Sequence, residues 1–309
     1  MLRIPETILP VFSVILLGFF LKRRGVVDPP FAKTANQIVF YVAIPAMLVN
    51  SISDAPFKEN FHLTAVICLL GAIVVQLILS LASARIMKIP GEHWGTFLQS
   101  SFHGNLGYMA YAVAYYAFGQ EEFARTAILS SFLMVAQNLM AVGVLLAFRT
   151  DCKINREEQG KVFIKSIYRN PIILAVVASM LYSASGAPMP APVKRFLQIL
   201  AGMALPTALL LIGAGLSFNA VRLRMKEIAG IGFLKLICFP LIGLIAMRAA
   251  HVPDFFILPG VILLAAPPAT VAYVMSVELG GDPELAASSI SILTLASALS
   301  YSLLLLLFV

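Results

Sequence analysis

The amino-acid sequence predicts an all-α integral membrane protein, with ten transmembrane helices arranged as two inverted repeats of five. Hydrophobic residues make up 60% of the 309 positions and charged residues only 12%, whereas soluble domains carry about a quarter charged residues. Long apolar stretches recur along the whole chain, and ~20 apolar residues are enough to cross a bilayer core of ~30 Å. The third observation is that the two halves of the chain resemble each other at a fixed offset.

Apolar runs between charged residues, prolines and glycines divide the chain into ten predicted spans. The first is expected to be retained rather than cleaved as a signal peptide, because Glu6 offsets Arg3 and the basic cluster 22–24 follows the apolar run. The predicted spans are residues 5–22, 32–53, 61–87, 93–118, 122–148, 162–184, 193–216, 226–249, 255–278 and 284–308. The predicted domains are a first five-helix repeat (1–148), a cytoplasmic linker (149–161) and a second, inverted repeat (162–309).

An internal repeat emerges when the chain is compared with itself at an offset of 161 residues. The segment 43–48, AIPAML, then aligns with 204–209, ALPTAL, without a gap. Composition alone predicts roughly one Gly or Pro coincidence. The observed pairs are Pro10 with Pro171, Pro29 with Pro190, Pro45 with Pro206, Gly25 with Gly186, Gly71 with Gly232 and Gly119 with Gly280. Because each half holds an odd number of spans, the second half must enter the membrane in the opposite sense.

Lysine and arginine side chains predict the orientation. With the N-terminus outside, fifteen of them fall at inner ends of spans: Lys22, Arg23, Arg24, Lys33, Arg85, Lys88, Arg149, Lys153, Arg156, Lys161, Lys165, Arg169, Arg222, Arg224 and Lys226. Six fall at outer ends: Arg3, Lys58, Arg125, Lys194, Arg195 and Arg248. The positive-inside rule therefore predicts that both chain ends lie outside an inner (plasma) membrane. A nucleic-acid partner is not expected, because no basic run is interleaved with aromatic residues.

Two predicted spans carry helix-breaking residues near their middle. The span 93–118 contains SSFHGNLGY at 100–108, and the span 255–278 contains AAPPAT at 265–270, the equivalent place in the repeat. Gly and Pro weaken helices, and the backbone groups that they free cannot face lipid. We therefore expect a protein cavity at the breaks, where the positive ends of half-helices attract an anion. The alternative is two independently kinked helices without a site. The candidate residues at the breaks are Gly104, Asn105, Tyr108, Pro267, Pro268, Ala269 and Thr270.

Polar side chains within the predicted spans are further candidates, because they are costly in lipid unless they are partnered. Gln137 and Asn138 either contribute to the site or hold helices together. Lys235 lies too deep to reach the surface, so it either neutralises a bound carboxylate or bonds neighbouring carbonyls and fixes helix packing. All fifteen Asp and Glu residues lie near span ends or in loops. Ion coupling through a buried acid is therefore not expected.

Neither a cofactor nor a metal site is expected. The three cysteines, Cys68, Cys152 and Cys238, and the four histidines show no paired or metal-ligand spacing. An enzyme is not expected either, because the spans hold no nucleophile, base or metal constellation.

Several short motifs occur in a fixed order along the chain. They are the segment 18–25, FYVAIP at 40–45, the break at Asn105, LPTALLLIGA at 205–214, Lys235 five residues before Pro240, and APPA at 266–269. In this order they resemble the auxin efflux carrier family of bacterial transporters, distant relatives of the plant PIN-type auxin carriers. The resemblance covers essentially the whole chain.

The resemblance implies a fold similar to sodium/bile-acid symporters and sodium/proton antiporters. Spans 1, 2, 6 and 7 would form a scaffold, and spans 3–5 and 8–10 a moving transport unit in which spans 4 and 9 cross at their breaks. In similar carriers an Asn in the fourth span contacts the substrate carboxylate, which is Asn105 here, and Gln137 falls where a fifth-span Gln is found. Plant members carry an acid and a base in the third span, whereas residues 61–84 have neither.

The expected function is elevator-type transport of a small organic anion, such as a dicarboxylate or an auxin-like carboxylate. Bacterial relatives are generally linked to dicarboxylates such as malate or malonate. The alternative is a membrane sensor with a transporter-like core that binds a carboxylate without flux. The expected partners are the carboxylate and membrane lipid, and because similar folds are usually dimeric, a homodimer is one expected assembly.

Overall fold

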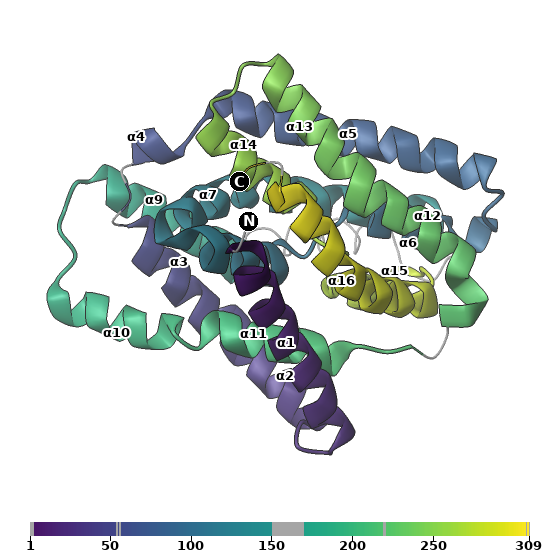
Figure 1. Ribbon diagram of the computed structural model, residues 1–309, viewed down its shortest axis with the longest axis horizontal. Coiled ribbons are helices and arrows are strands. Elements are labelled where there is room, and N and C mark those ends of the chain that lie inside the picture. The colour runs from purple at the N-terminus through teal and green to yellow at the C-terminus, as the bar shows by residue number, and fades with distance from the viewer. Residues whose placement is uncertain are drawn as a thin grey trace.

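The computed structural model describes residues 3–53, 55, 57–149, 170–218, 221–306 and 308. These residues form helices and connecting segments without a strand, apart from one isolated antiparallel bridge (Figure 1). The α-helices are α1 Arg3–Arg23, α2 Pro29–Ile38, α3 Ile44–Ile52, α4 Phe57–Asn60, α5 Leu63–Ile86, α6 Trp94–Phe102, α7 Tyr111–Ala147, α9 Pro171–Ala184, α10 Ala191–Ala201, α11 Ala204–Gly215, α12 Met225–Phe233, α13 Phe239–Ala249, α14 Asp254–Leu264, α15 Val271–Leu279 and α16 Pro283–Leu306. The π turns are η1 Val39–Ala43, η3 Leu106–Ala110 and η5 Leu234–Cys238, and the 3₁₀ turns are η2 Gly91–His93 and η4 Val221–Arg224.

Six of the described helical stretches are long and apolar enough to cross a membrane. They are Pro29–Ile52, Leu63–Ile86, Leu106–Ala147, Ala191–Gly215, Val221–Ala249 and Pro283–Leu306. Two further apolar helices, α9 and α14, are shorter. These helices, together with α1, overlap the predicted ranges. The predicted linker 149–161 lies outside the described residues beyond Arg149, as does the beginning of the predicted span 162–184.

The stretch Leu106–Ala147 is too long for one crossing, since ~20 residues suffice. Gly119 divides it, with φ of 84° and ψ of −167° inside an otherwise helical run. This backbone conformation is open to glycine and strained for any other residue. Gly119 therefore marks the change from the predicted span 93–118 to the predicted span 122–148.

Several helices begin where an Asx–Pro pair predicts a start. The Asp28 carboxylate accepts a hydrogen bond from the Phe31 amide at 2.8 Å, directly before Pro29 opens α2. The Asn170 side chain accepts from the Ile172 amide at 3.0 Å, directly before Pro171 opens α9. Such a cap satisfies a free amide at the helix end, and proline at the first position loses no hydrogen bond.

The four described glycines with positive φ fall into two pairs that are each separated by 161 residues. Gly25 and Gly186 have φ of 73° and 66°, and Gly119 and Gly280 have φ of 84° and 78°. The offset found in the sequence thus connects residues with the same unusual backbone conformation.

The helices pack as two groups. In Figure 1, α1, α2, α10 and α11 lie toward the bottom, whereas α5, α13 and α14 extend across the top. In the first group, α1 packs against α11, and α3 packs against α9 and α10. In the second group, α5 packs against α6 and α13, α14 packs against α7 and α13, and α16 packs against α12, α15 and α6. Contacts of α1 with α7 and α16, and of α3 with α7, join the two groups.

The contact of α1 with α11 depends on two glycines. A methyl group at Gly213 would lie 1.8 Å from the Ile15 carbonyl oxygen, and one at Gly18 would lie 2.1 Å from the Leu210 carbonyl oxygen. Both obstacles are backbone atoms, so a side-chain rearrangement cannot remove the clash. The two helix backbones touch in the way that small residues permit in membrane proteins.

We expect Gly213→Val to lower the melting temperature of the detergent-purified protein by ~5 °C or more, because forcing the helices apart costs roughly 3 kcal/mol. The matched control is Gly143→Val on α7, where an added methyl group meets no atom within 4 Å. Equal melting temperatures for the two variants would show that the close contact does not stabilise the fold.

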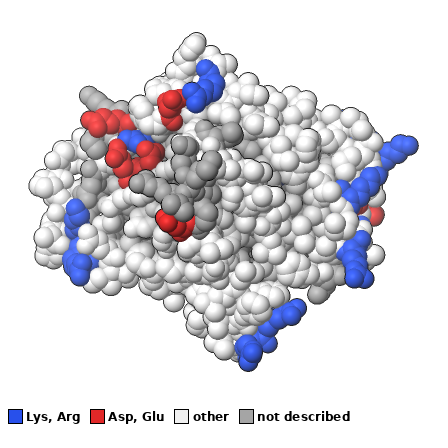
Figure 2. All heavy atoms as spheres, in the orientation of Figure 1, with Lys and Arg blue, Asp and Glu red and all other residues white. Residues whose placement is uncertain are grey.

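In Figure 2, most Lys and Arg side chains lie toward the edges of the view, acidic side chains gather in its upper left part, and a broad uncharged surface extends over the rest. The Lys226 ammonium donates to the Met87 carbonyl, which joins the end of α5 to the start of α12. Arg125 forms ion pairs with Glu121 and Glu122, and its guanidinium lies 5.2 Å from the centre of the Phe255 ring. This distribution is typical of a protein that presents an apolar belt to lipid.

Candidate functional site

Two helix breaks lie against each other in the second group of helices. Residues 103–105 separate α6 from η3, and residues 265–270 separate α14 from α15. The Asn105 amide donates to the Pro267 carbonyl at 2.8 Å, and the Ala269 amide donates to the His103 carbonyl at 2.9 Å. Gly104 and Pro268 thereby form an antiparallel bridge. Each break supplies hydrogen-bond partners that the other has lost.

Gln137 holds the first break from α7. Its side-chain oxygen accepts from the Gly104 amide at 3.1 Å, and its side-chain nitrogen donates to the Phe102 carbonyl at 3.0 Å. The side chain is 1% exposed. One amide therefore satisfies both a free donor and a free acceptor, which a buried break in lipid requires.

A cavity of about 740 Å³ ends at the two breaks. Seven of the predicted site residues line it: Gly104, Asn105, Tyr108, Gln137, Asn138, Ala269 and Thr270. Its wall also includes Lys22, Asp28 and Lys33, near the turn between α1 and α2. The cavity thus connects a charged end of the molecule with the breaks.

Two half-helices point their N-terminal ends into this cavity. Residues 104–108 and 269–271, which lead into η3 and α15, all belong to its wall. The first amides of a helix have no partner within the helix, and the helix dipole makes that end positive. Asn105 occupies the cap position of η3, is 6% exposed and does not use its side chain to cap the helix. The Asn105 side chain therefore leaves the first amides of η3 uncapped, and Asn105 itself belongs to the cavity wall.

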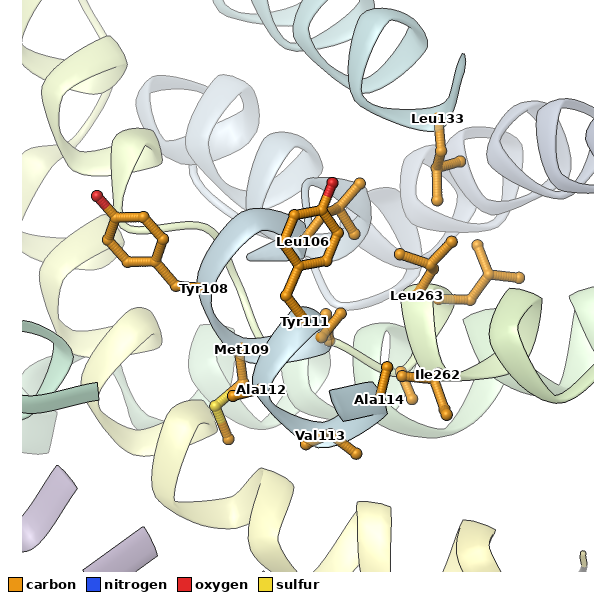
Figure 3. Close-up of a cluster of buried hydrophobic side chains, with 14 of the residues drawn as sticks. Leu106, Tyr108, Met109, Tyr111, Ala112, Val113, Ala114, Leu133, Ile262 and Leu263 are labelled. Carbon is orange, nitrogen blue, oxygen red and sulfur yellow. The ribbon is translucent and has the colours of Figure 1, made fainter. Parts of the chain in front are cut away.

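Tyr108 connects the break to the first group of helices. Its hydroxyl donates to the Asn36 side chain on α2 at 2.7 Å. Figure 3 shows that the Tyr108 and Tyr111 rings leave the chain in different directions. Tyr111 instead packs within the second group, where its hydroxyl lies 2.6 Å from the Ser130 hydroxyl. Tyr108 thus contributes a hydrogen bond to the wall where the two groups face each other.

Three of the predicted site residues do not belong to the cavity wall. Pro267 and Pro268 contribute to the pairing of the breaks instead. Lys235 lies in η5, is 0% exposed and donates to the Leu264 carbonyl at 2.8 Å, with its ammonium 4.6 Å from the centre of the Phe239 ring. This is the carbonyl contact expected from the interpretation in which Lys235 fixes helix packing.

The structure adds residues that the sequence analysis did not single out. Asn36, His103, Asn170 and Tyr273 also line the cavity. His103 is 3% exposed, and its Nδ1 lies 3.5 Å from the Gln99 side-chain nitrogen. Because His103 lies inside the segment 100–108, the sequence could have indicated that it lines the cavity. Asn36 lines the cavity only because of how α2 is rotated, which the sequence does not show. Among the described residues, no group of three His, Cys, Asp or Glu side chains could hold a metal ion.

Comparisons with known proteins agree with this architecture. The profile of a family described as membrane transport protein matches residues 3–305. An uncharacterised transporter of Methanothermobacter thermautotrophicus is 27% identical over 304 residues, which cover 96% of each chain. A Rhizobium meliloti protein, provisionally named a malonate transporter, is 26% identical over 305 residues, with 96% of this chain and 93% of the relative covered. The uncharacterised transporter YfdV of Escherichia coli is 23% identical over 265 residues, with 85% and 84% covered.

The matched family consists of membrane transporters, and the apolar helices identify a multi-pass membrane protein. The family match extends over nearly the whole chain, so the protein belongs to this family of membrane transport proteins, the auxin efflux carrier family that its motifs resemble.

Proposed function

We propose that the protein is an elevator-type secondary transporter that carries a small organic anion, a dicarboxylate or an auxin-like carboxylate, across an inner (plasma) membrane. The observation that carries this proposal is the end of the cavity, where two half-helix N-termini and the uncapped Asn105 side chain meet. Paired N-terminal ends supply directed amides and positive potential without a buried charge, which suits an anionic group that must be released again.

Charges near the other end of the cavity favour the same class of ligand. Lys22 and Lys33 belong to the wall there, and the one acid among them, Asp28, uses its carboxylate to cap α2. A basic entrance raises the local concentration of anions. We therefore infer that the ligand enters as an anion from the side on which α1 meets α2.

The two groups of helices correspond to the scaffold and the transport unit of an elevator. The cavity lies between them, because α2 and α11 contribute Asn36 and Leu211 while the breaks contribute Asn105 and Thr270. The breaks and their partner Gln137 belong to one group, so the ligand site can move with that group as a rigid body. The paired positive-φ glycines support an inverted arrangement of two five-span repeats.

The contacts of charged residues at the ends of spans support the proposed topology, in which both chain termini lie outside. The contact of Lys226 with Met87 brings together two segments that carry predicted inner residues. The contact of Arg125 with Phe255 brings together two segments predicted to be outer. If successive spans cross between this inner face and this outer face, a repeat of five spans ends on the face opposite to the one where it began. The second repeat must then be inverted.

The substrate class is narrowed by the chemistry of the site and by one relative. Two N-terminal ends on one cavity wall can each receive a carboxylate, and the Rhizobium meliloti relative is provisionally named a malonate transporter. We therefore propose a short dicarboxylate of the malonate type as the first substrate to test.

We expect purified protein in liposomes to exchange labelled malonate for unlabelled malonate. Asn105→Ala should slow this exchange by ~10-fold or more, because a hydrogen bond to a charged group contributes roughly 1.5–3 kcal/mol. The matched control is Gln37→Ala, which removes an exposed amide on α2 that does not line the cavity. Comparing the exchange rates of malonate, succinate and an indole carboxylate ranks the carboxylate classes as substrates.

A stabilising shift in melting temperature identifies binding independently of flux, because a ligand stabilises the state to which it binds. A carboxylate that shifts the melting temperature but is never exchanged would favour the alternative of a membrane sensor. Unchanged exchange in Asn105→Ala would remove Asn105 from the site.

A further inference from the structure

The backbone of the first break is extended where it meets the second break. His103 has φ of −77° and ψ of 96°, and Gly104 forms the antiparallel bridge with Pro268. In an extended chain, alternate side chains lie on the same side. His103 and Asn105 should therefore project from one side of the bridge, and a side chain at position 104 from the other.

The surroundings of these three residues agree with this alternation. His103 and Asn105 both belong to the cavity wall. A methyl group at Gly104 would instead lie 3.0 Å from the Lys235 nitrogen and 3.3 Å from the Ala266 methyl group, and neither of these residues lines the cavity. The imidazole ring of His103 therefore lies on the ligand side of the break, together with the Asn105 side chain.

The two side chains lie beside different half-helix ends. Asn105 occupies the cap position of η3. The His103 carbonyl accepts from the Ala269 amide at 2.9 Å, directly before α15, and the His103 ring shares its partner Gln99 with Met275 on α15. Each of the two positive helix ends that face the cavity thus has one polar side chain next to it.

Gln99 on α6 determines which ring nitrogen of His103 carries the proton. The side-chain nitrogen of Gln99 lies 3.5 Å from Nδ1 of His103 and donates to the Met275 sulfur at 3.4 Å. A thioether has no proton to give, so the group that faces Met275 must be the amide nitrogen and not the amide oxygen. An amide nitrogen only donates, and Nδ1 therefore accepts. A ring that accepts at Nδ1 is neutral and carries its proton on Nε2.

The Nε2 proton is suited to a ligand. Within the described part of the chain, the hydrogen bond of the His103 ring is the one at Nδ1, and His103 is 3% exposed. A buried donor without a partner is unfavourable, so the ring favours a ligand that brings an acceptor to the cavity. Because this donor is uncharged, it can bind a carboxylate and release it again.

We propose that His103 is the second ligand-binding side chain of the cavity, and that its Nε2–H donates to one carboxylate of a dicarboxylate whose other carboxylate is bound beside Asn105. Residues two apart in an extended chain are separated by ~6.5 Å, a spacing that suits the two ends of a three- or four-carbon dicarboxylate. This inference rests on the proposed transport function and names the residue that distinguishes dicarboxylates from monocarboxylates. Gln99 is a positioning residue, because it orients the ring and does not touch the ligand.

Binding of malonate and of propanoate to the purified protein, measured by the shift in melting temperature, tests the proposal. Both acids have three carbons, but only malonate has a second carboxylate. We expect His103→Leu to lower the ratio of malonate affinity to propanoate affinity by ~10-fold or more, and malonate exchange in liposomes to fall with it. Equal weakening of both acids, or wild-type binding of malonate by His103→Leu, would overturn the proposal. A wild-type protein that neither binds nor exchanges malonate would instead reject the transport function itself.

Two conservative variants locate the donor on the ring. In His103→Gln the amide nitrogen can reach the position of Nε2, whereas in His103→Asn the shorter side chain reaches only the position of Nδ1. We expect His103→Gln to recover most of the malonate affinity and His103→Asn to recover none, with similar melting temperatures in the absence of ligand. The opposite order would contradict a contact through Nε2.

Gln99→Met tests the role of Gln99, because it removes the donor to Nδ1 and keeps a side chain of similar length. We expect this variant to weaken malonate binding less than His103→Leu does. The double variant Gln99→Met with His103→Leu should bind malonate no more weakly than His103→Leu alone, since Gln99 acts through the ring. Losses that add in the double variant would show that Gln99 does not position His103.

Discussion

Replacing Gln137 with Leu is expected to lower malonate exchange by ~100-fold or more, since each buried polar group left without a partner costs roughly 1–3 kcal/mol. Leu has a similar volume but neither accepts nor donates a hydrogen bond. The Gly104 amide and the Phe102 carbonyl would both lose their partner, in a site where 1% exposure leaves little access for water. The first break would then rearrange, and Asn105 would leave its position on the cavity wall.

Exchange in liposomes measures this effect, and the melting temperature separates loss of the site from loss of the fold. The matched control is Gln37→Leu, the same substitution at an exposed position on α2. Gln137→Glu adds a second comparison, because a deprotonated carboxylate still lacks the donor that the Phe102 carbonyl needs. Exchange at the wild-type rate in Gln137→Leu would mean that Gln137 only packs helices together, which was the alternative interpretation of this amide.

The positions of the two breaks were predictable because they depend on local chemistry. Gly104 and Gly107 around Asn105, and the consecutive Pro267 and Pro268, disfavour helix wherever they lie in the fold. The repeat then indicated that the two breaks belong together. The pairing of the Asn105 amide with the Pro267 carbonyl goes beyond this, because its register is set by the three-dimensional approach of segments 162 residues apart in sequence.

Which polar side chains face the cavity was harder to predict. Gln137 and Asn138 are neighbours in sequence and both belong to the wall, yet only Gln137 is bonded to the break. Lys235 satisfied the same criterion of depth in an apolar span but points to the far side of Gly104. Rotation of a helix about its axis decides between these outcomes, and packing against distant helices sets that rotation. The buried Gln76 on α5, whose side-chain nitrogen donates to the Ser101 carbonyl at 2.9 Å, was overlooked for a related reason. An amide in the middle of a span has no distinctive spacing in the sequence.

Helix boundaries show the same division between local and distant causes. The second predicted span began at residue 32, whereas α2 begins at Pro29, because the Asp28 cap and the proline act within one turn. Asn170 caps α9 at Pro171 in the same way. The boundary between the predicted spans 93–118 and 122–148 falls at Gly119, inside an otherwise helical run. A single glycine with positive φ is sufficient to redirect the chain there.

Replacing Gly104 with Val is expected to reduce malonate exchange below detection, a loss of ~100-fold or more when overpacking costs roughly 3 kcal/mol at the site itself. A first methyl group at this position would already lie 3.0 Å from the Lys235 nitrogen, 3.3 Å from the Ala266 methyl group and 3.4 Å from the Ala266 carbonyl oxygen. Valine adds two more methyl groups at a residue that is paired with Pro268 across the breaks. The two breaks would have to separate, or the ammonium would have to leave the Leu264 carbonyl.

Gly104→Ala distinguishes between these two consequences, because a single methyl group can be accommodated by a shift of the flexible lysine end but not by the backbone of the opposite break. If Lys235 moves, Gly104→Ala should lose exchange only partly, and the double variant Gly104→Ala with Lys235→Ala should be no worse than Lys235→Ala alone. If the breaks separate instead, the two substitutions should act independently and their effects should add. Gly143→Val adds the same side chain in open space on α7, away from the breaks. A comparable loss in that control would assign the effect to a general loss of stability and not to the crossing of the breaks.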